Sequence, residues 1–320
     1  MMEVVKILKG GSLSNTVVIQ DGNRKFVRKS ISSKKNREFG LVRWQSQIRK
    51  LQLLNKYMPQ SSVAIEQIGF FEDYYFYDIP YIDCSVNCYE ALLDGESEDL
   101  IAEEMAILLS MMANIKYGKI RGALNIYISE EIRSPLKLAL EVANEGRLML
   151  SNSELNLFTD AVSRAVLLVD NLLQQTKEVE VSESLTHGNL TLENILWNKK
   201  SKKILMIDPY AETYCETIMG DVSQVSQSCE SGYEFISNIF DKKEFKIDRY
   251  PVGEIPNCLL NFSGALTKKI NRESWYSEAN LTLLKASQFI RMFPFKMVKS
   301  PRQGAAFMLH GITILEKTKC

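Results

Sequence analysis

Histidines and metal-type cysteine patterns are scarce in this sequence. Its 320 residues include only two histidines, His187 and His310, and its six cysteines show no C-x-x-C spacing. Both observations argue against zinc, which is usually held by closely spaced cysteines and histidines. The G-x-S-x-G motif that carries the nucleophile of α/β-hydrolases is also lacking. Cysteines without a disulfide-type pattern fit free thiols in a reducing compartment, so we expect a cytoplasmic protein.

Net charge and long hydrophobic runs are lacking as well. Lysine and arginine together number 39, as do aspartate and glutamate, so the formal net charge is zero. No chain-wide field therefore attracts nucleic acid or an anionic membrane. Asp170 interrupts the most apolar stretch, residues 166–173, and residues 1–8 lack the apolar core of a signal peptide. We expect no nucleic-acid partner, no membrane segment and no secretion signal.

The composition that is present, 45% hydrophobic and 24% charged, is typical of an ordered globular protein. Apolar periodicity predicts an α+β protein, with a mostly β first part and a mostly helical remainder. Strands are expected at residues 4–8, 16–20, 25–31, 63–71, 74–82, 195–198 and 203–207, with a hairpin turn at Asp21-Gly22. Helices are expected at residues 34–57, 96–115, 129–144, 153–176, 221–240, 274–292 and 303–316.

Polar side chains are concentrated in one segment of the helical part. His187, Asn189 and Asn194 lie in a loop, and a hydrophobic strand pair then leads to Asp208. A carboxylate beside an asparagine amide oxygen suits Mg²⁺, which prefers oxygen ligands and keeps water or phosphate oxygens in its remaining positions. Taken singly, Asn194 and Asp208 would be ordinary turn residues. Together they predict a magnesium site.

These residues resemble the aminoglycoside phosphotransferase and choline kinase-like family, whose members share the protein kinase fold. The family pattern H-G-D-x-x-x-x-N, followed by a strand-borne I-D, is met at His187, Gly188, Asn194 and Asp208, whereas Asn189 replaces the catalytic Asp. The resemblance implies ATP and Mg²⁺ as cofactors and Asn194 and Asp208 as metal ligands. A weaker similarity, carried partly by residues 227–235, is to kinase-like proteins encoded with capsule or surface-sugar genes.

The resemblance also implies a bilobal protein kinase-like fold. A small antiparallel-sheet N-lobe that covers the nucleotide would span residues 1–83, and a larger helical C-lobe with the catalytic loop, metal site and acceptor site would span residues 84–320. Asp221 would support the catalytic core, and His187 would orient the loop rather than carry a proton.

Several N-terminal residues resemble parts of a nucleotide site. The loop that covers the phosphates would be Gly10, Gly11, Ser12 and Ser14, although a Gly-Gly pair is also common in plain hairpin turns. Lys29 resembles the strand lysine that pairs with phosphates, with Arg28 as a competitor on the opposite face of the strand. Glu38 would be the helix acid that pairs with Lys29, or an ordinary first-turn acid. The adenine hinge would include Asp78, Ile79 and Tyr81.

Asn189 decides how much catalysis is expected, because an amide cannot accept the proton of an acceptor hydroxyl. General-base catalysis typically contributes about 10²- to 10⁴-fold. A natural pseudokinase, a slow kinase with another base and an engineered Asp→Asn trap all fit the sequence. If the other parts are intact, Asn189→Asp should raise turnover.

The sequence therefore predicts an ATP- and Mg²⁺-dependent phosphotransferase that acts on a hydroxyl of a small molecule, plausibly a sugar or a sugar-containing metabolite. The alternative is a nucleotide-binding pseudokinase that serves as a regulatory or scaffold module. Neither the acceptor nor the oligomeric state can be read from the sequence.

Overall fold

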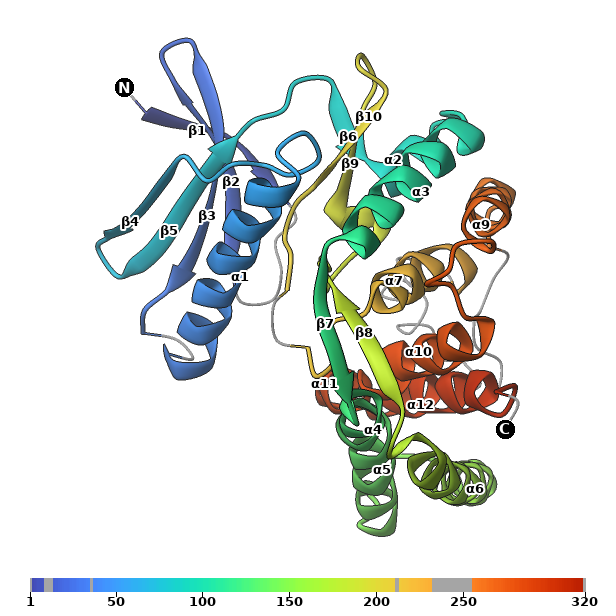
Figure 1. The fold of residues 1–320 in the computed structure, drawn as a ribbon. Helices are drawn as coiled ribbons and strands as arrows, with labels where there is room; N and C mark the ends of the chain where they lie inside the picture. Colours follow the sequence, from blue (N-terminus) through green and yellow to red (C-terminus); the bar gives the residue numbers. More distant parts are fainter. Residues whose placement is uncertain (1, 9–13, 35–36, 211–212, 232–254, 319–320) are drawn as a thin grey trace. The chain divides into compact units, whose positions relative to one another are not determined.

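The computed structural model describes the chain except for residues 1, 9–13, 35–36, 211–212, 232–254 and 319–320. An antiparallel sheet at the N-terminus is followed by a mostly helical part (Figure 1). This order confirms the expected α+β class. Internal contacts divide the chain into unit 1, Met1–Glu96 with His187–Thr213, and unit 2, Ser97–Thr186 with Tyr214–Cys320.

Unit 1 is built on a five-stranded sheet in the order β1-β2-β3-β5-β4, with antiparallel neighbours throughout. Its strands are β1 (Met2–Leu8), β2 (Asn15–Asp21), β3 (Arg24–Ser32), β4 (Gln67–Phe71) and β5 (Tyr74–Pro80). Helix α1 (Arg37–Tyr57) packs on one face of this sheet (Figure 1). The core between them contains Ile31, Trp44, Ile48, Leu51, Val63, Tyr77 and Ile79. Strand β3 lies between β2 and β5 and is therefore an interior strand of the sheet.

A second, three-stranded sheet brings residues 187–213 into unit 1. It has the order β10-β9-β6 and consists of β6 (Ser85–Asn87), β9 (Ile195–Asn198) and β10 (Lys203–Met206). Helix α2 (Cys88–Leu93) and the 3-10 turn η2 (Leu192–Asn194) pack beside it. The Met206 N–H donates to the carbonyl of Ser61 over 2.8 Å, which ties β10 to the segment after α1.

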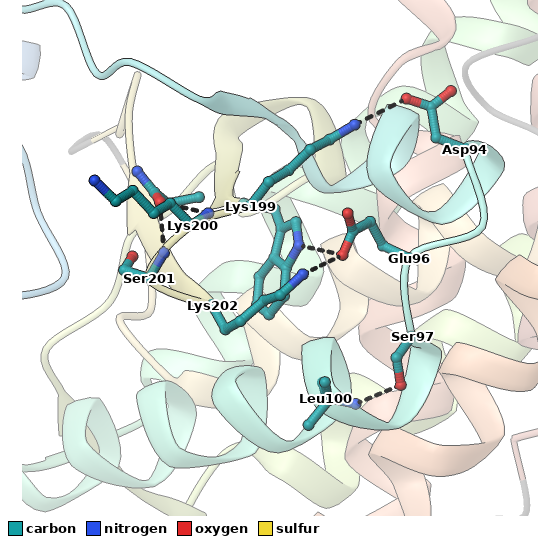
Figure 2. A network of polar contacts seen from close by, with 10 residues as sticks. Asp94, Glu96, Ser97, Leu100, Lys199, Lys200, Ser201 and Lys202 are labelled. Atoms are coloured by element: carbon teal, nitrogen blue, oxygen red, sulfur yellow. Dashed lines mark hydrogen bonds and ion pairs between the residues drawn. The ribbon is translucent and has the colours of Figure 1, made fainter.

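A polar cluster fixes the β9–β10 hairpin to the segment that follows α2 (Figure 2). The carboxylate of Glu96 accepts hydrogen bonds from the buried indole Nε1 of Trp197 over 3.0 Å and from Lys202 Nζ over 2.9 Å. Lys199 pairs with Asp94 over 3.3 Å on the same side (Figure 2). These bonds lower the pKa of Glu96. The hairpin that leads to Asp208 is thereby anchored at its far end.

In its described residues, unit 2 is helical apart from a two-stranded antiparallel sheet of β7 (Lys116–Arg121) and β8 (Glu180–Ser184). Its helices are α3 (Glu98–Asn114), α4 (Ala123–Ile128), α5 (Ser134–Asn144), α6 (Asn152–Thr176), α7 (Ile218–Glu230), α9 (Asn257–Ile270), α10 (Glu278–Ile290), α11 (Phe293–Lys299) and α12 (Pro301–Leu315). The π-helical turn Ser129–Arg133 joins α4 to α5. The main core lies among α4, α5, α6, α10 and α12. No helix in the described part of the chain is both long and apolar enough to cross a bilayer.

Several elements differ from the sequence-based expectation. The predicted helix at residues 129–144 begins earlier, at Ala123, and α7 begins at Ile218 rather than at residue 221. The part of that predicted helix beyond residue 231 lies outside the described residues. The sequence analysis did not predict the helices α2, α9 and α11 or the strands β7 and β8 of unit 2. Strand β6 was also unexpected, and it matters most here because it binds β9 next to the candidate site.

Candidate functional site

Lys29 and Asp208 form the centre of the candidate site. Lys29 lies on β3 opposite Tyr77 of β5, and its side chain is only 7% exposed. Its Nζ lies 2.7 Å from Oδ1 of Asp208, which follows β10 and remains 31% exposed. A buried ammonium group requires a partner of opposite charge. The structure therefore provides the strand lysine with Asp208 as its partner.

Arg28, the competitor of Lys29, points to the other face of the sheet. Its guanidinium binds both carboxylate oxygens of Asp78, over 2.8 and 2.7 Å, and lies 3.9 Å from the ring centroid of Phe76. The carbonyl of Asp78 accepts the N–H of Glu66. Both acceptor groups of Asp78 are thus used within the sheet, which leaves the side chain of this predicted hinge residue engaged by Arg28.

His187 has a fully buried ring with a defined tautomer. Nε2 donates to the carbonyl of Ile207 over 2.8 Å, and Nδ1 accepts the N–H of Asn189 over 3.3 Å. Burial lowers the pKa of His187 to about 4, and the hydrogen bond to Ile207 offsets only part of this effect. The imidazole is therefore neutral at physiological pH and uses both nitrogens to hold the loop. It is not available as a proton carrier.

Asp208 adopts a left-handed backbone conformation, with φ of 54°. The N–H of Ile207 donates to the carbonyl of Asn194 over 3.0 Å, and the N–H of Tyr210 donates to the carbonyl of His187 over 2.9 Å. Gly188 has φ of 77°, and a Cβ at this position would lie 2.1 Å from the carbonyl oxygen of Tyr210. Only glycine permits this close approach between the loop and the strand end.

Two asparagine side chains complete the loop. Asn189 Nδ2 donates to the carbonyl of Asp208 over 3.2 Å, and Asn194 Nδ2 donates to the carbonyl of Asn189 over 2.8 Å. Because its NH₂ group donates to this carbonyl, the side-chain atom of Asn194 that could bind a metal is its amide oxygen. The amide oxygen of Asn194 and the carboxylate of Asp208 suit Mg²⁺, which completes its shell with water and phosphate oxygens. Within the described residues, no group of three or more His, Cys, Asp or Glu side chains forms an alternative metal site.

Each of the other predicted site residues either has a position in the fold or lies outside the described part of the structure. Gly10, Gly11 and Ser12 lie outside the described residues, and so does the side chain of Glu38; Ser14 immediately precedes β2. Ile79 is near the end of β5, and Tyr81 follows that strand. Asp221 is buried in the first turn of α7, in unit 2.

Tyr77 is a site residue that the sequence analysis did not single out. Its side chain is fully buried, and its hydroxyl has no hydrogen-bond partner among the described residues. Burial, and then the nearby charge of Asp208, raises the pKa of Tyr77 well above its usual value. Tyr77 lies directly opposite Lys29 in the register between β3 and β5, and the sequence carries no local signal for that register.

Comparison with known proteins gives a match of fold. No protein-family model and no curated protein matches the sequence. Aminoglycoside phosphotransferase APH(4)-Ia, in a ternary complex with AMP-PNP and hygromycin B, matches with a TM-score of 0.58 at 12% identity, over 97% of this chain and 92% of its own. Spectinomycin phosphotransferase APH(9)-Ia, in complex with ADP and spectinomycin, matches with a TM-score of 0.55 at 10% identity, over 98% of this chain and 92% of its own. A Haemophilus somnus 129PT protein named as a fructosamine-3-kinase matches with a TM-score of 0.52 at 15% identity, over 98% of this chain and 90% of its own. The chain therefore has the protein kinase-like fold of the aminoglycoside phosphotransferases, as its motif resemblance implied.

Proposed function

We propose that this protein binds Mg·ATP and transfers the γ-phosphate to a hydroxyl group of a small molecule. The observation that carries the proposal is the Lys29–Asp208 pair, 2.7 Å apart, with the side chain of Asn194 fixed in the same loop system. A lysine, a carboxylate and an amide oxygen are the groups that phosphoryl transfer needs for phosphate and metal binding. All three lie in unit 1.

Each residue has a proposed role. Lys29 pairs with the α- and β-phosphates, and Asp208 and Asn194 hold Mg²⁺, which neutralises negative charge on the phosphate oxygens when it is bound. Ser14 and the Gly10-Gly11-Ser12 turn cover the phosphates. Because the carboxylate of Asp78 is bound by Arg28, we assign the adenine contact to the backbone of Ile79 and Tyr81.

The acceptor is proposed to be a polyhydroxylated small molecule such as a sugar. Support comes from the structural neighbours, one of which is complexed with spectinomycin and another with hygromycin B. At 10–12% identity these matches support the fold and the class of chemistry rather than a particular acceptor.

A second candidate function, nucleotide binding without turnover, is favoured because none of the described residues around Asp208 is an obvious base. Asn189 carries no carboxylate, His187 is buried and neutral, and the carboxylate of Asp208 is paired with Lys29. Phosphoryl transfer depends mainly on alignment and charge neutralisation, so slow turnover remains compatible with this geometry. The two functions differ in turnover and share the nucleotide site.

Nucleotide binding is tested by thermal unfolding with ADP and with ATP, each in the presence of Mg²⁺ or of EDTA. A ligand that binds only the folded state stabilises it by about 2.7 kcal/mol at a hundredfold excess over Kd. We expect Mg·ATP to raise the Tm of the wild-type chain and of Lys6→Met, whose lysine is exposed on the edge strand β1. Lys29→Met should lose most of the shift. An unchanged Tm at millimolar Mg·ATP would contradict the nucleotide site.

Turnover is tested separately by release of ADP, with water alone and with a panel of sugars and aminoglycosides. Acceptor-dependent ADP release that is lost in Lys29→Met would support the phosphotransferase. A clear Mg·ATP shift without ADP release across the panel would favour the pseudokinase.

A further inference from the structure

We propose that the side-chain amide of Asn189 is a positioning group that holds Asp208, so that residue 189 acts as a hydrogen-bond donor rather than as an impaired base. The hydrogen bond itself does not depend on the activity of the protein. Its consequence for metal binding rests on the proposed function, because Asp208 is the proposed metal ligand.

The donor role of Asn189 follows from the chemistry of its partner. Asn189 Nδ2 lies 3.2 Å from the carbonyl oxygen of Asp208. A carbonyl oxygen can only accept, so the group that faces it must be the amide NH₂. Asn189 is itself held by its backbone, since its N–H donates to His187 Nδ1 and its carbonyl accepts from Asn194 Nδ2 and the Thr191 N–H. The amide is therefore held in place for its partner.

Asp208 needs such support because of its backbone. With φ of 54°, this non-glycine residue occupies a sparsely populated conformation that the surrounding structure must hold. The N–H and carbonyl of Ile207 bind Asn194 and His187, and the N–H of Tyr210 binds His187. The bond from Asn189 to the carbonyl of Asp208 completes this set. In this backbone conformation, Oδ1 of Asp208 lies 2.7 Å from Nζ of Lys29.

Replacing Asn189 with aspartate would turn the attractive contact with the carbonyl oxygen of Asp208 into a repulsive one. An ionised carboxylate has the same shape but no donor, so one of its oxygens would face the carbonyl oxygen of Asp208. It would also add a negative charge close to the carboxylate of Asp208. The expectation from the sequence was that Asn189→Asp raises turnover. The geometry points instead to a displaced Asp208 and weaker metal binding.

The test compares Asn189→Asp with a matched control, Asn87→Asp, by unfolding without ligand between pH 4 and pH 8. The Oδ1 of Asn87 accepts the N–H of Glu90 at the start of α2. A carboxylate serves equally well there, so the control makes the same chemical change in unit 1 without loss of a donor. At pH 7.5 we expect Asn189→Asp to raise the unfolding equilibrium constant about 5- to 30-fold and the control to leave it nearly unchanged.

The pH dependence separates a lost donor from a general structural defect. The carboxyl group introduced by Asn189→Asp should have a folded-state pKa above its unfolded value of about 3.9, because its protonated form can donate to the carbonyl of Asp208. The destabilisation should therefore be small at pH 4 and should grow as the pH rises through the folded-state pKa. Asn189→Ala, which lacks both donor and charge, should show a loss that does not change over this range.

A separate measurement follows the affinity for ADP with Mg²⁺ and with EDTA. At pH 7.5 we expect Asn189→Asp to lose about tenfold in the Mg²⁺-dependent part of this affinity. Matching stability curves for Asn189→Asp and Asn87→Asp, or a rise in turnover without loss of stability, would overturn the inference. If no variant and not even the wild-type chain binds ADP, the proposed function fails, while the ligand-free stability curves still decide the role of Asn189.

Discussion

The carboxylate of Asp208 pairs with Lys29 and remains partly exposed, as its proposed role as a metal ligand requires. Oδ1 lies 2.7 Å from Lys29 Nζ, and nearly a third of the side chain is exposed. The ion pair with Lys29 therefore holds the carboxylate of Asp208 in one orientation. The phosphates of a bound nucleotide would pair with the ammonium group of Lys29 in place of Asp208.

We expect Asp208→Asn to remove the Mg²⁺-dependent part of nucleotide binding, by about 10- to 100-fold, and also to lower the stability of the fold, because the buried ammonium group of Lys29 loses its counter-charge. Asparagine tolerates the left-handed backbone at this position, so the main change is the loss of charge. Isothermal titration with ADP, with and without Mg²⁺, measures the effect. Asp94→Asn, which removes an exposed carboxylate from the Lys199 pair, is the control. Equal Mg²⁺ dependence in both variants would contradict metal ligation by Asp208.

His187 should make the stability of the protein depend on pH. Its folded-state pKa is about 4, whereas an unfolded histidine has a pKa of about 6.5. Below pH 6.5 the unfolded chain binds a proton that the folded chain does not, so the free energy of unfolding falls as the pH drops toward 4, by about 3 kcal/mol in total. Chemical denaturation at several pH values between 7 and 5 measures the free energy of unfolding. The slope of this free energy against pH should be shallower for His187→Gln than for wild type or His310→Gln. Equal slopes in all three proteins would contradict the neutral, buried assignment.

At the residue scale, the sequence indicated which kinds of residue form the site and on which face of a strand they lie. It did not indicate which residues they contact. The alternation of a strand correctly separated Lys29 from Arg28. The partner of Arg28, Asp78, lies fifty residues away in sequence and depends on the register between β3 and β5, which no local pattern specifies. The donor role of Asn189 likewise needs the position of a carbonyl group, and the sequence carries no signal for that.

At the scale of elements, the site depends on a hairpin that is anchored at both ends. The end near Asp208 is held by loop hydrogen bonds, and the far end is held by Glu96 through Trp197 and Lys202. The indole of Trp197 is fully buried and therefore needs the acceptor that Glu96 supplies.

Substitutions of Glu96 should separate the buried hydrogen bond from the exposed ion pair. Glu96→Gln keeps an acceptor for Trp197 and loses only the pair with Lys202, for which we expect a cost below about 1 kcal/mol. Glu96→Ala leaves the indole N–H without its partner and should cost about 1–3 kcal/mol. Urea denaturation of both variants measures the difference. Equal losses would mean that the Trp197 bond contributes nothing to stability.

The sequence analysis missed several helices and strands, and the physical reason differs from one to another. Residues 116–121 form β7 with every side chain exposed, so no apolar alternation marks this strand. Helix α9 did carry a signal, since its buried residues Leu259, Phe262, Leu266 and Ile270 follow helical spacing. The long helices α1 and α6 were recognised because their apolar periodicity extends over many turns.

At the scale of the molecule, all of the proposed metal and phosphate ligands belong to unit 1. We therefore expect Mg·ADP to slow amide hydrogen exchange in β3, in residues 187–194 and in β9–β10. The core of unit 2 in α5, α6 and α12 should respond less. Hydrogen-exchange mass spectrometry measures this, with ADP in EDTA as the reference. Protection confined to unit 2 would contradict the placement of the site.

The overall order of a sheet followed by helices could be predicted, because it follows from periodicity and from the motif at His187 and Asp208. The assignment of residues 187–213 to the same unit as residues 1–96 could not. It depends on β6, three residues that pair with β9 more than a hundred positions later. Long-range pairing of such a short strand leaves no trace in a local window.

This discontinuity of unit 1 affects how the protein is made. A ribosome that has finished Glu96 must still translate residues 97–208 before β9, β10 and Asp208 exist. At about 5–20 residues per second, this takes on the order of ten seconds. During that interval β6 has no strand partner, Trp197 has not yet covered α2, and Lys29 has no counter-charge. The nascent N-terminal sheet is thus the stage at which a chaperone would be most useful to this chain.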